Sequence, residues 1–143
     1  MESHHANRAE LNALVVDDEE LVRKLVSAAL KGLGVEKIET ADDGRAAIEI
    51  VQAQHNSGNP FNLIVCDWEM PVMDGIDFLE RFRADNLDAI FIMVTARTAT
   101  EDFNKAKKKG VDYFFMKPLE ADMLRIRLDS AIDAAIQRRQ KAL

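Results

Sequence analysis

The chain has 143 residues, of which 48% are hydrophobic, and a formal net charge of −6 at pH 7. This length fits one domain, and the apolar content is sufficient to build its core. The negative charge argues against a general nucleic-acid-binding protein. The single cysteine excludes a disulfide within the chain, and no apolar run is long enough for membrane insertion, so we expect a cytoplasmic protein.

Residues 1–10 are expected to form an N-terminal tail, and residues 11–143 are expected to form the domain. His4 and His5 lie in this tail and are interpreted as solvent-exposed rather than metal-binding. His55 belongs to a polar segment rich in turn-forming residues and is expected on an exposed loop. No histidine is therefore placed for catalysis.

The first buried strand is expected at Leu11–Val16, and it stops at the acidic sequence Asp17-Asp18-Glu19-Glu20. A helix follows, because apolar residues recur at helical spacing from Leu21 onward. Carboxylates at the start of a helix bind its free N–H groups and suit its dipole. Capping therefore explains Glu19 and Glu20, but it explains Asp17 and Asp18 less well.

Apolar runs alternate with segments of helical spacing along the rest of the chain. Further strands are expected at Lys37–Ala41, from Leu63, at Ala89–Val94 and at Tyr113–Met116, with helices over about 44–54, 76–82, 100–109 and 120–139. Strands that alternate with helices indicate a parallel sheet covered on both faces, which is a doubly wound α/β fold. Of its two common strand orders, 2-1-3-4-5 places the ends of strands one and three beside the topological switch point.

The third strand carries the most informative signal. Its run Leu63-Ile64-Val65-Cys66 is apolar, so Cys66 is interpreted as a core residue, but the run ends at the carboxylate of Asp67. Pro71 and the Asp74-Gly75 pair then favour a loop rather than an immediate helix. Asp67 is therefore expected at the carboxyl edge of the sheet, where ligands bind in this fold.

Five side chains are predicted to meet at that edge, namely Asp17, Asp18, Asp67, Thr95 and Lys117. Three carboxylates in one cleft repel one another unless a cation holds them in the charged form. Oxygen ligands without histidine or thiolate fit Mg²⁺. With a hydroxyl and a lysine nearby, the set is sufficient for in-line phosphoryl transfer, and Asp67 is the candidate acceptor. The chain has no glycine-rich phosphate loop, so the phosphoryl group must come from a partner or a small phosphodonor.

At these residues the chain resembles the response-regulator receiver domains of two-component signalling, in particular the stand-alone chemotaxis-type (CheY-like) form. The matching segments are Val15-Val16-Asp17-Asp18-Glu19, the stretch from Asp67 to Gly75, Val94-Thr95-Ala96 and Lys117-Pro118, in the order and spacing of the family. The resemblance covers roughly residues 11 to 137. It implies a flavodoxin-like, three-layer sandwich.

The resemblance also implies roles for single residues. Asp67 would be phosphorylated by a sensor histidine kinase or a histidine phosphotransfer protein, and Lys117 would pair with the phosphoryl group. The Mg²⁺ ligands would be Asp18, Asp67 and the main-chain carbonyl of Glu69, with Asp17 holding the metal directly or through water. The bond between Lys117 and Pro118 is typically cis in the family.

Thr95 would be the switch hydroxyl, and its aromatic partner would be Phe114, which lacks the hydroxyl of a tyrosine. Ala96 and Trp68 are expected at the phosphate pocket, although Trp68 is equally well interpreted as packed against the neighbouring helices. The side chain of Glu69 either adjusts the lifetime of the phosphoryl group or points to solvent.

The expected output is protein–protein contact through the face formed by residues 100–130, where Lys105, Lys108 and Lys109 would meet an acidic target or form a solvated surface. No direct DNA binding is expected, and phosphorylation is a candidate trigger for homodimer formation. A receiver of this kind is not an enzyme, beyond catalysing its own phosphorylation and dephosphorylation. Three alternatives stay open: a phosphorelay intermediate rather than a motor-type regulator, a Mg²⁺-dependent phosphohydrolase with an aspartyl-phosphate intermediate, and a scaffold that is never phosphorylated.

Overall fold

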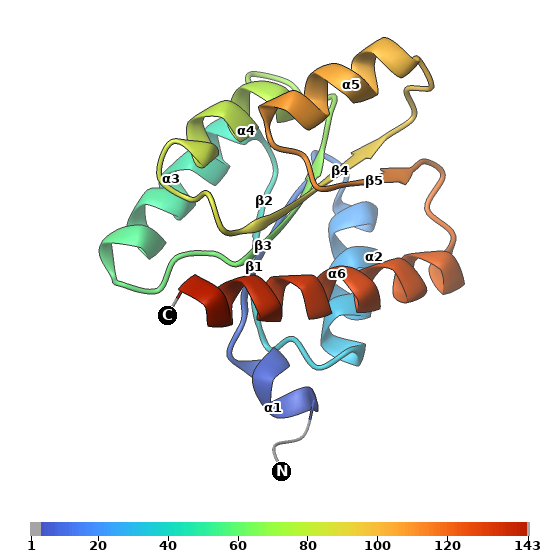
Figure 1. The fold of residues 1–143 in the computed structure, drawn as a ribbon. Helices are drawn as coiled ribbons and strands as arrows, with labels where there is room; N and C mark the ends of the chain where they lie inside the picture. The colour runs from blue at the N-terminus through green and yellow to red at the C-terminus, as the bar shows by residue number, and fades with distance from the viewer. Residues whose placement is uncertain (1–3, 143) are drawn as a thin grey trace.

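The expected strands form one parallel sheet in the order β2-β1-β3-β4-β5, which confirms the predicted topology (Figure 1). The structure, a computed structural model, describes residues 4–142 and, within them, the side chains of residues 7–141. The strands are β1 (Asn12–Val16), β2 (Lys37–Ala41), β3 (Leu63–Asp67), β4 (Ile90–Thr95) and β5 (Tyr113–Met116). The helices in this part of the chain are α1 (His4–Ala9), α2 (Glu20–Gly32), α3 (Gly44–Asn56), α4 (Gly75–Arg83), α5 (Thr100–Lys109) and α6 (Ala121–Ala142).

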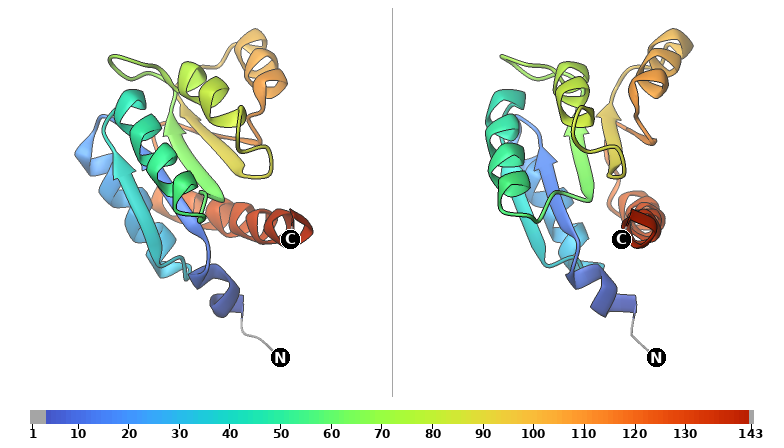
Figure 2. Two further views of the ribbon diagram at one scale, coloured as in Figure 1. Left: turned by 90° about the vertical axis from the view of Figure 1, so that its left-hand side faces the viewer. Right: turned by 60° about the vertical axis from the view of Figure 1, so that its left-hand side comes forward.

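Helices cover both faces of the sheet, as the predicted three-layer sandwich requires (Figures 1 and 2). Alternate residues of each strand point to opposite faces. Val15 and Val65 pack with α2 and α6 on one face, whereas Ile64 and Cys66 pack with α3 and α4 on the other. Cys66 is fully buried, which confirms its interpretation as a core residue. Among residues 4–142, no helix combines the length and apolar character that crossing a membrane requires.

The N-terminal segment differs from the expected tail, because residues His4–Ala9 form helix α1. Arg8 fixes this helix to the domain. Its guanidinium is buried, contacts Asp129 at 2.7 Å and Asp133 at 3.0 Å on α6, and donates a hydrogen bond to the carbonyl of Leu33 at 2.8 Å. A buried charge needs such partners, and they come from segments far away in the sequence, so the local pattern gave no sign of them.

The histidine predictions have two outcomes. His4 and His5 belong to α1, but their side chains lie outside the described residues. His55 is exposed as expected, yet it lies in the last turn of α3 rather than in the following loop.

The loop between β3 and α4 is held by close backbone contacts. The N–H of Gly75 donates to the carbonyl of Trp68 at 2.7 Å, and a Cβ at Gly75 would lie 2.5 Å from the carbonyl oxygen of Asp67. Only glycine fits there without a shift of the loop. Asp74 caps α4, since its carboxylate accepts a hydrogen bond from the N–H of Asp77 at 2.9 Å. The Asp-Gly pair therefore sets both the end of the loop and the start of α4.

Val72, in the same loop, has a φ of +72° and an exposed side chain. A positive φ strains a β-branched residue, whereas asparagine adopts a positive φ more readily. We expect Val72→Asn to raise the free energy of unfolding by about 1 kcal/mol, measured by urea denaturation. Leu87→Asn is the matched control, because Leu87 is equally exposed but does not have a positive φ. A lower free energy of unfolding for Val72→Asn than for wild type would contradict the claim that Val72 is strained.

Candidate functional site

The carboxyl ends of the central strands bring the predicted residues to one edge of the sheet. Asp17 follows β1, Asp67 ends β3, Thr95 ends β4 and Lys117 follows β5. Strand pairing fixes their spacing, since Val16 pairs with Cys66, Asp67 with Val94 and Thr95 with Met116. The N–H of Lys117 also donates to the carbonyl of Thr95 at 2.9 Å. These four residues therefore lie at one edge of the sheet, as predicted.

The ammonium group of Lys117 lies among three carboxylates. Its Nζ is 3.1 Å from Oδ2 of Asp67, 3.8 Å from Oδ2 of Asp17 and 3.9 Å from Oε1 of Glu19. Asp17 and Asp67 are almost fully buried, with 2% and 4% of their surface exposed. The site therefore holds more negative than positive charge in surroundings that water screens poorly.

Burial controls the protonation of the site. It raises the pKa of Asp17 to about 6, against the hydrogen bond from the N–H of Glu19, and the charge of Asp67 adds to the rise. Burial likewise raises the pKa of Asp67, while Lys117 opposes that rise through its hydrogen bond and charge. For Lys117, burial lowers the pKa, but the contacts with Asp67 outweigh it and leave the pKa raised. A further cation bound to these carboxylates would stabilise their ionised forms.

Carboxylates suited to such a cation are close together. Asp17, Asp18 and Glu19 each place one oxygen within 4.8 Å of the others. Oxygen ligands of this kind fit Mg²⁺. Glu19 was expected only as a helix cap, but its side chain makes no capping hydrogen bond, and Glu20 instead pairs with Lys24 at 3.1 Å.

Thr95 and Ala96 occupy the fourth strand end. Thr95 is buried, and its Oγ1 accepts a hydrogen bond from the N–H of Arg97 at 2.9 Å. Ala96 is exposed and, with Lys117 and Pro118, lines a groove of about 430 Å³. A small side chain here leaves the groove open beside Lys117. The peptide bond between Lys117 and Pro118 is cis, as the resemblance implied.

Trp68 and Glu69 are both explained by Arg97, a residue that was not identified from the sequence. Trp68 is buried, and the Arg97 guanidinium lies over its ring at 4.6 Å from the centroid. The side chain of Glu69 is mostly exposed and pairs with Nε of Arg97 at 3.2 Å. Of the two interpretations for Trp68, the structure favours packing. The only feature of the sequence that could have pointed to Arg97 is its place two positions after Thr95.

The aromatic switch candidate, Phe114, is half-buried and contacts α5. Its ring meets the ring of Phe103 edge to face, with centroids 4.8 Å apart. Phe114 pairs in the sheet with Met93 on β4, two residues before Thr95. It therefore lies between the strand that carries Thr95 and the helix of the expected output face.

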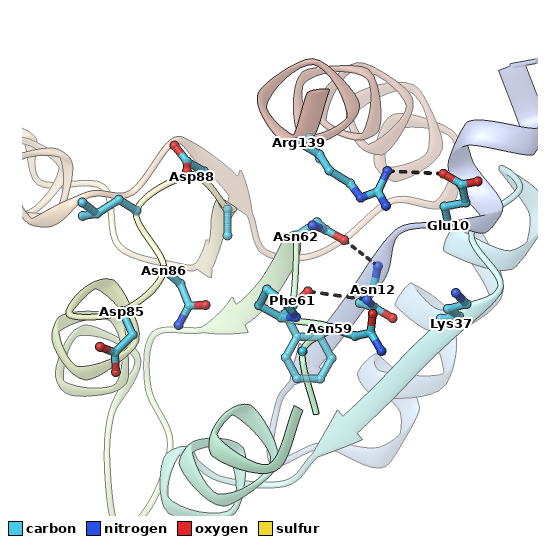
Figure 3. Close-up of a pocket in the computed structure, with 15 residues that line it drawn as sticks. Glu10, Asn12, Lys37, Asn59, Phe61, Asn62, Asp85, Asn86, Asp88 and Arg139 are labelled. Atoms are coloured by element: carbon cyan, nitrogen blue, oxygen red, sulfur yellow. Dashed lines mark hydrogen bonds and ion pairs between the residues drawn. The ribbon is translucent and has the colours of Figure 1, made fainter. Parts of the chain in front are cut away.

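A cavity of about 330 Å³ lies at the opposite, amino-terminal end of the strands (Figure 3). Its wall includes Asn12, which donates through its N–H to the side chain of Asn62 at 2.9 Å, and Arg139, which pairs with Glu10 at 3.3 Å. None of the predicted site residues lines this cavity. The candidate site is therefore the carboxyl edge around Asp67.

Comparisons with known proteins identify the family of the chain. The family model of the response regulator receiver domain matches residues 13–129. Over 125 residues the chain is 33% identical to chemotaxis protein CheY-3 of Vibrio cholerae serotype O1, a match that covers 86% of this chain and 92% of the relative.

Solved structures give the same family. The chemotaxis protein CheY4 of Vibrio cholerae matches with a TM-score of 0.74 and 30% identity, over 85% of this chain and 98% of that one. The CheX–CheY–BeF₃–Mg²⁺ complex from Borrelia burgdorferi matches with a TM-score of 0.76 and 28% identity, over 84% of this chain and 87% of that one. The chain therefore belongs to the response regulator receiver domains, the phospho-accepting proteins of two-component signalling.

Proposed function

We propose that Asp67 is the phospho-acceptor of this receiver domain and that it takes the phosphoryl group from a phosphohistidine. The observation that carries the proposal is the position of the Lys117 ammonium, 3.1 Å from the buried carboxylate of Asp67 and beside that of Asp17. A carboxylate is a weak nucleophile, so its reaction depends on positioning and on neutralisation of the incoming negative charge. The strand ends position Asp67 and bring the positive charge of Lys117 beside it.

The proposed reaction uses the residues at this edge, a Mg²⁺ ion and a phosphoryl donor. An oxygen of Asp67 forms a bond to phosphorus, and the bond between phosphorus and the histidine nitrogen breaks, so the electron pair stays on the imidazole. Lys117 neutralises charge on the phosphoryl oxygens, and the Thr95 hydroxyl donates a hydrogen bond to one of them. Asp17, Asp18, Asp67 and the main-chain carbonyl of Glu69 would hold Mg²⁺, which when bound neutralises the carboxylates and the phosphoryl group.

The exposed face of α5, β5 and α6 is the proposed output surface. It combines the lysines of α5 with the exposed apolar side chains of Met116, Met123 and Ile126. Lys109 pairs with Glu80 on α4, so Lys105 and Lys108 are better placed to meet an acidic partner. A matching receiver from Borrelia burgdorferi forms a complex with CheX. This supports protein–protein contact as the output here.

No observation favours the phosphohydrolase alternative. Such enzymes place a second acid two residues after the nucleophile in one motif, and Asp17-Asp18-Glu19 lacks the hydroxyl residue that follows. The motor-type and phosphorelay interpretations differ in their partner, because a phosphotransfer protein removes the phosphoryl group and a motor protein does not. Mixing the phosphorylated chain with each class of partner distinguishes the two interpretations, because only a phosphotransfer protein should remove the phosphoryl group.

Incubation with acetyl phosphate and Mg²⁺ is expected to add one phosphoryl group, a mass gain of about 80 Da in the intact protein. Asp67→Asn is expected to abolish the gain, because it replaces the nucleophilic carboxylate with a neutral amide. Asp74→Asn is the matched control, since Asp74 lies in the same loop and asparagine can also cap α4. A gain that persists in Asp67→Asn, or that does not require Mg²⁺, would refute the proposal.

Mg²⁺ binding is expected to weaken as the pH falls. Burial raises the pKa of Asp17 to about 6 without metal, so below this pH a proton must leave before the carboxylate can bind Mg²⁺. We expect affinity to be about tenfold lower at pH 5 than at pH 7, measured by titration of the fluorescence of Trp68, the single tryptophan.

The Asp17→Asn variant provides the control for this titration. It should bind Mg²⁺ more weakly at pH 7 and show a smaller change between pH 7 and pH 5, because the group that titrates is gone. An equal affinity of the wild-type chain at both pH values would contradict the account.

A further inference from the structure

Arg97 connects the phosphorylation loop to helix α5 through its side chain. Its guanidinium lies over the ring of Trp68, its Nε pairs with Glu69 at 3.2 Å, and its NH1 donates to Oδ2 of Asp102 at 3.4 Å. Trp68 and Glu69 directly follow Asp67, whereas Asp102 lies in the first turn of α5. One side chain therefore spans the gap between the acceptor loop and the start of the helix.

The backbone of Arg97 is tied to Thr95. Its N–H donates to the Thr95 hydroxyl oxygen at 2.9 Å. If the Thr95 hydroxyl turns toward a phosphoryl group on Asp67, its lone pairs turn too, and the hydrogen bond from the N–H of Arg97 changes. Such a movement therefore alters a hydrogen bond that holds the backbone of Arg97.

The first turn of α5 has few other attachments. Ala106 is the buried residue of this helix, and the N-cap residue Ala99 offers no side chain to its free N–H groups. The far end is held better, by the ion pair of Lys109 with Glu80 and by Arg83, which donates to the carbonyl of Gly110. Near the start, the described contacts are the pair of Arg97 with Asp102 and the rings of Phe103 and Phe114.

We propose that Arg97 is a positioning residue that couples Thr95 to the first turn of α5. In the unphosphorylated chain it holds Asp102 near the loop after Asp67. Phosphorylation of Asp67, on which this inference rests, adds negative charge beside Trp68 and Glu69 and turns the Thr95 hydroxyl. Arg97 then exchanges the carboxylate of Asp102 for the more highly charged phosphoryl group, and the first turn of α5 is released to change the output face.

The charge balance supports this exchange. The partners of Arg97 are single carboxylates, and its side chain and those of Glu69 and Asp102 are 37%, 71% and 32% exposed. Ion pairs this exposed are weak. A phosphoryl group carries nearly twice the charge of a carboxylate and three acceptor oxygens, so it competes well for one guanidinium.

Hydrogen exchange of the amides of residues 102–106, followed by mass spectrometry, tests the coupling. In the wild type, phosphorylation with acetyl phosphate and Mg²⁺ should raise the exchange rate of these amides at least threefold. Arg97→Ala and Asp102→Asn should show a similar rise without phosphorylation, and phosphorylation should add little to it. Arg125→Ala is the matched control, because Arg125 forms an exposed ion pair with Asp122 on α6, and it should behave as wild type.

Trp68 fluorescence gives a second measurement that loss of stability alone would not reproduce. Removal of the stacked guanidinium in Arg97→Ala should change the emission, and Arg97→Lys should restore only part of the exchange protection, because lysine keeps the charge but cannot stack as a plane. Intact mass, measured on the same samples, separates the two proposals. A sample with no mass gain overturns the phosphorylation of Asp67. A sample with the full gain but unchanged exchange in α5, or an Arg97→Ala chain with wild-type exchange, overturns the coupling.

Discussion

Two buried carboxylates that share one ammonium group are the feature on which the account depends. Asp17 and Asp67 lie at neighbouring strand ends, and Lys117 reaches both from the end of β5. Water cannot screen these charges well, and burial favours protonated carboxyl groups, as the raised pKa values of both aspartates show. Such an arrangement is poor for stability but well suited to hold a divalent cation and to receive a phosphoryl group. The proposed function follows from this excess of buried negative charge, which a bound divalent cation would neutralise.

The rest of the fold holds these charged groups close together. Parallel pairing of β1, β3 and β4 brings the acids and Thr95 to one edge, and apolar residues on both faces of the sheet fix the register. The loop after Asp67 is tightened by Gly75 at a close backbone contact and by Val72 at a positive φ. Both features confine unusual backbone geometry to the loop, whereas the strands keep regular geometry. The strands and this loop therefore hold the residues of the site in fixed positions.

Much of the fold and site could be predicted, because the relevant signals are local. A four-residue apolar run that ends in a carboxylate predicts a strand and its end, and several such ends in a parallel fold meet at one edge. Arg97, Glu19 and Arg8 could not be assigned in this way. Each depends on partners brought near by folding: Trp68 and Asp102 for Arg97, Lys117 for Glu19, and α6 for Arg8. Long charged side chains have many partners within reach, and a single sequence does not distinguish them.

The most direct test of the central claim is chemical identification of the phosphorylated residue. Borohydride reduces an acyl phosphate on aspartate to homoserine, so treatment of the phosphorylated chain followed by peptide sequencing in the mass spectrometer marks the acceptor. The account predicts homoserine at position 67 and unchanged aspartate at positions 17, 18 and 74. Homoserine at any of those positions, with Asp67 intact, would show that the shared lysine does not select the acceptor and would contradict the account.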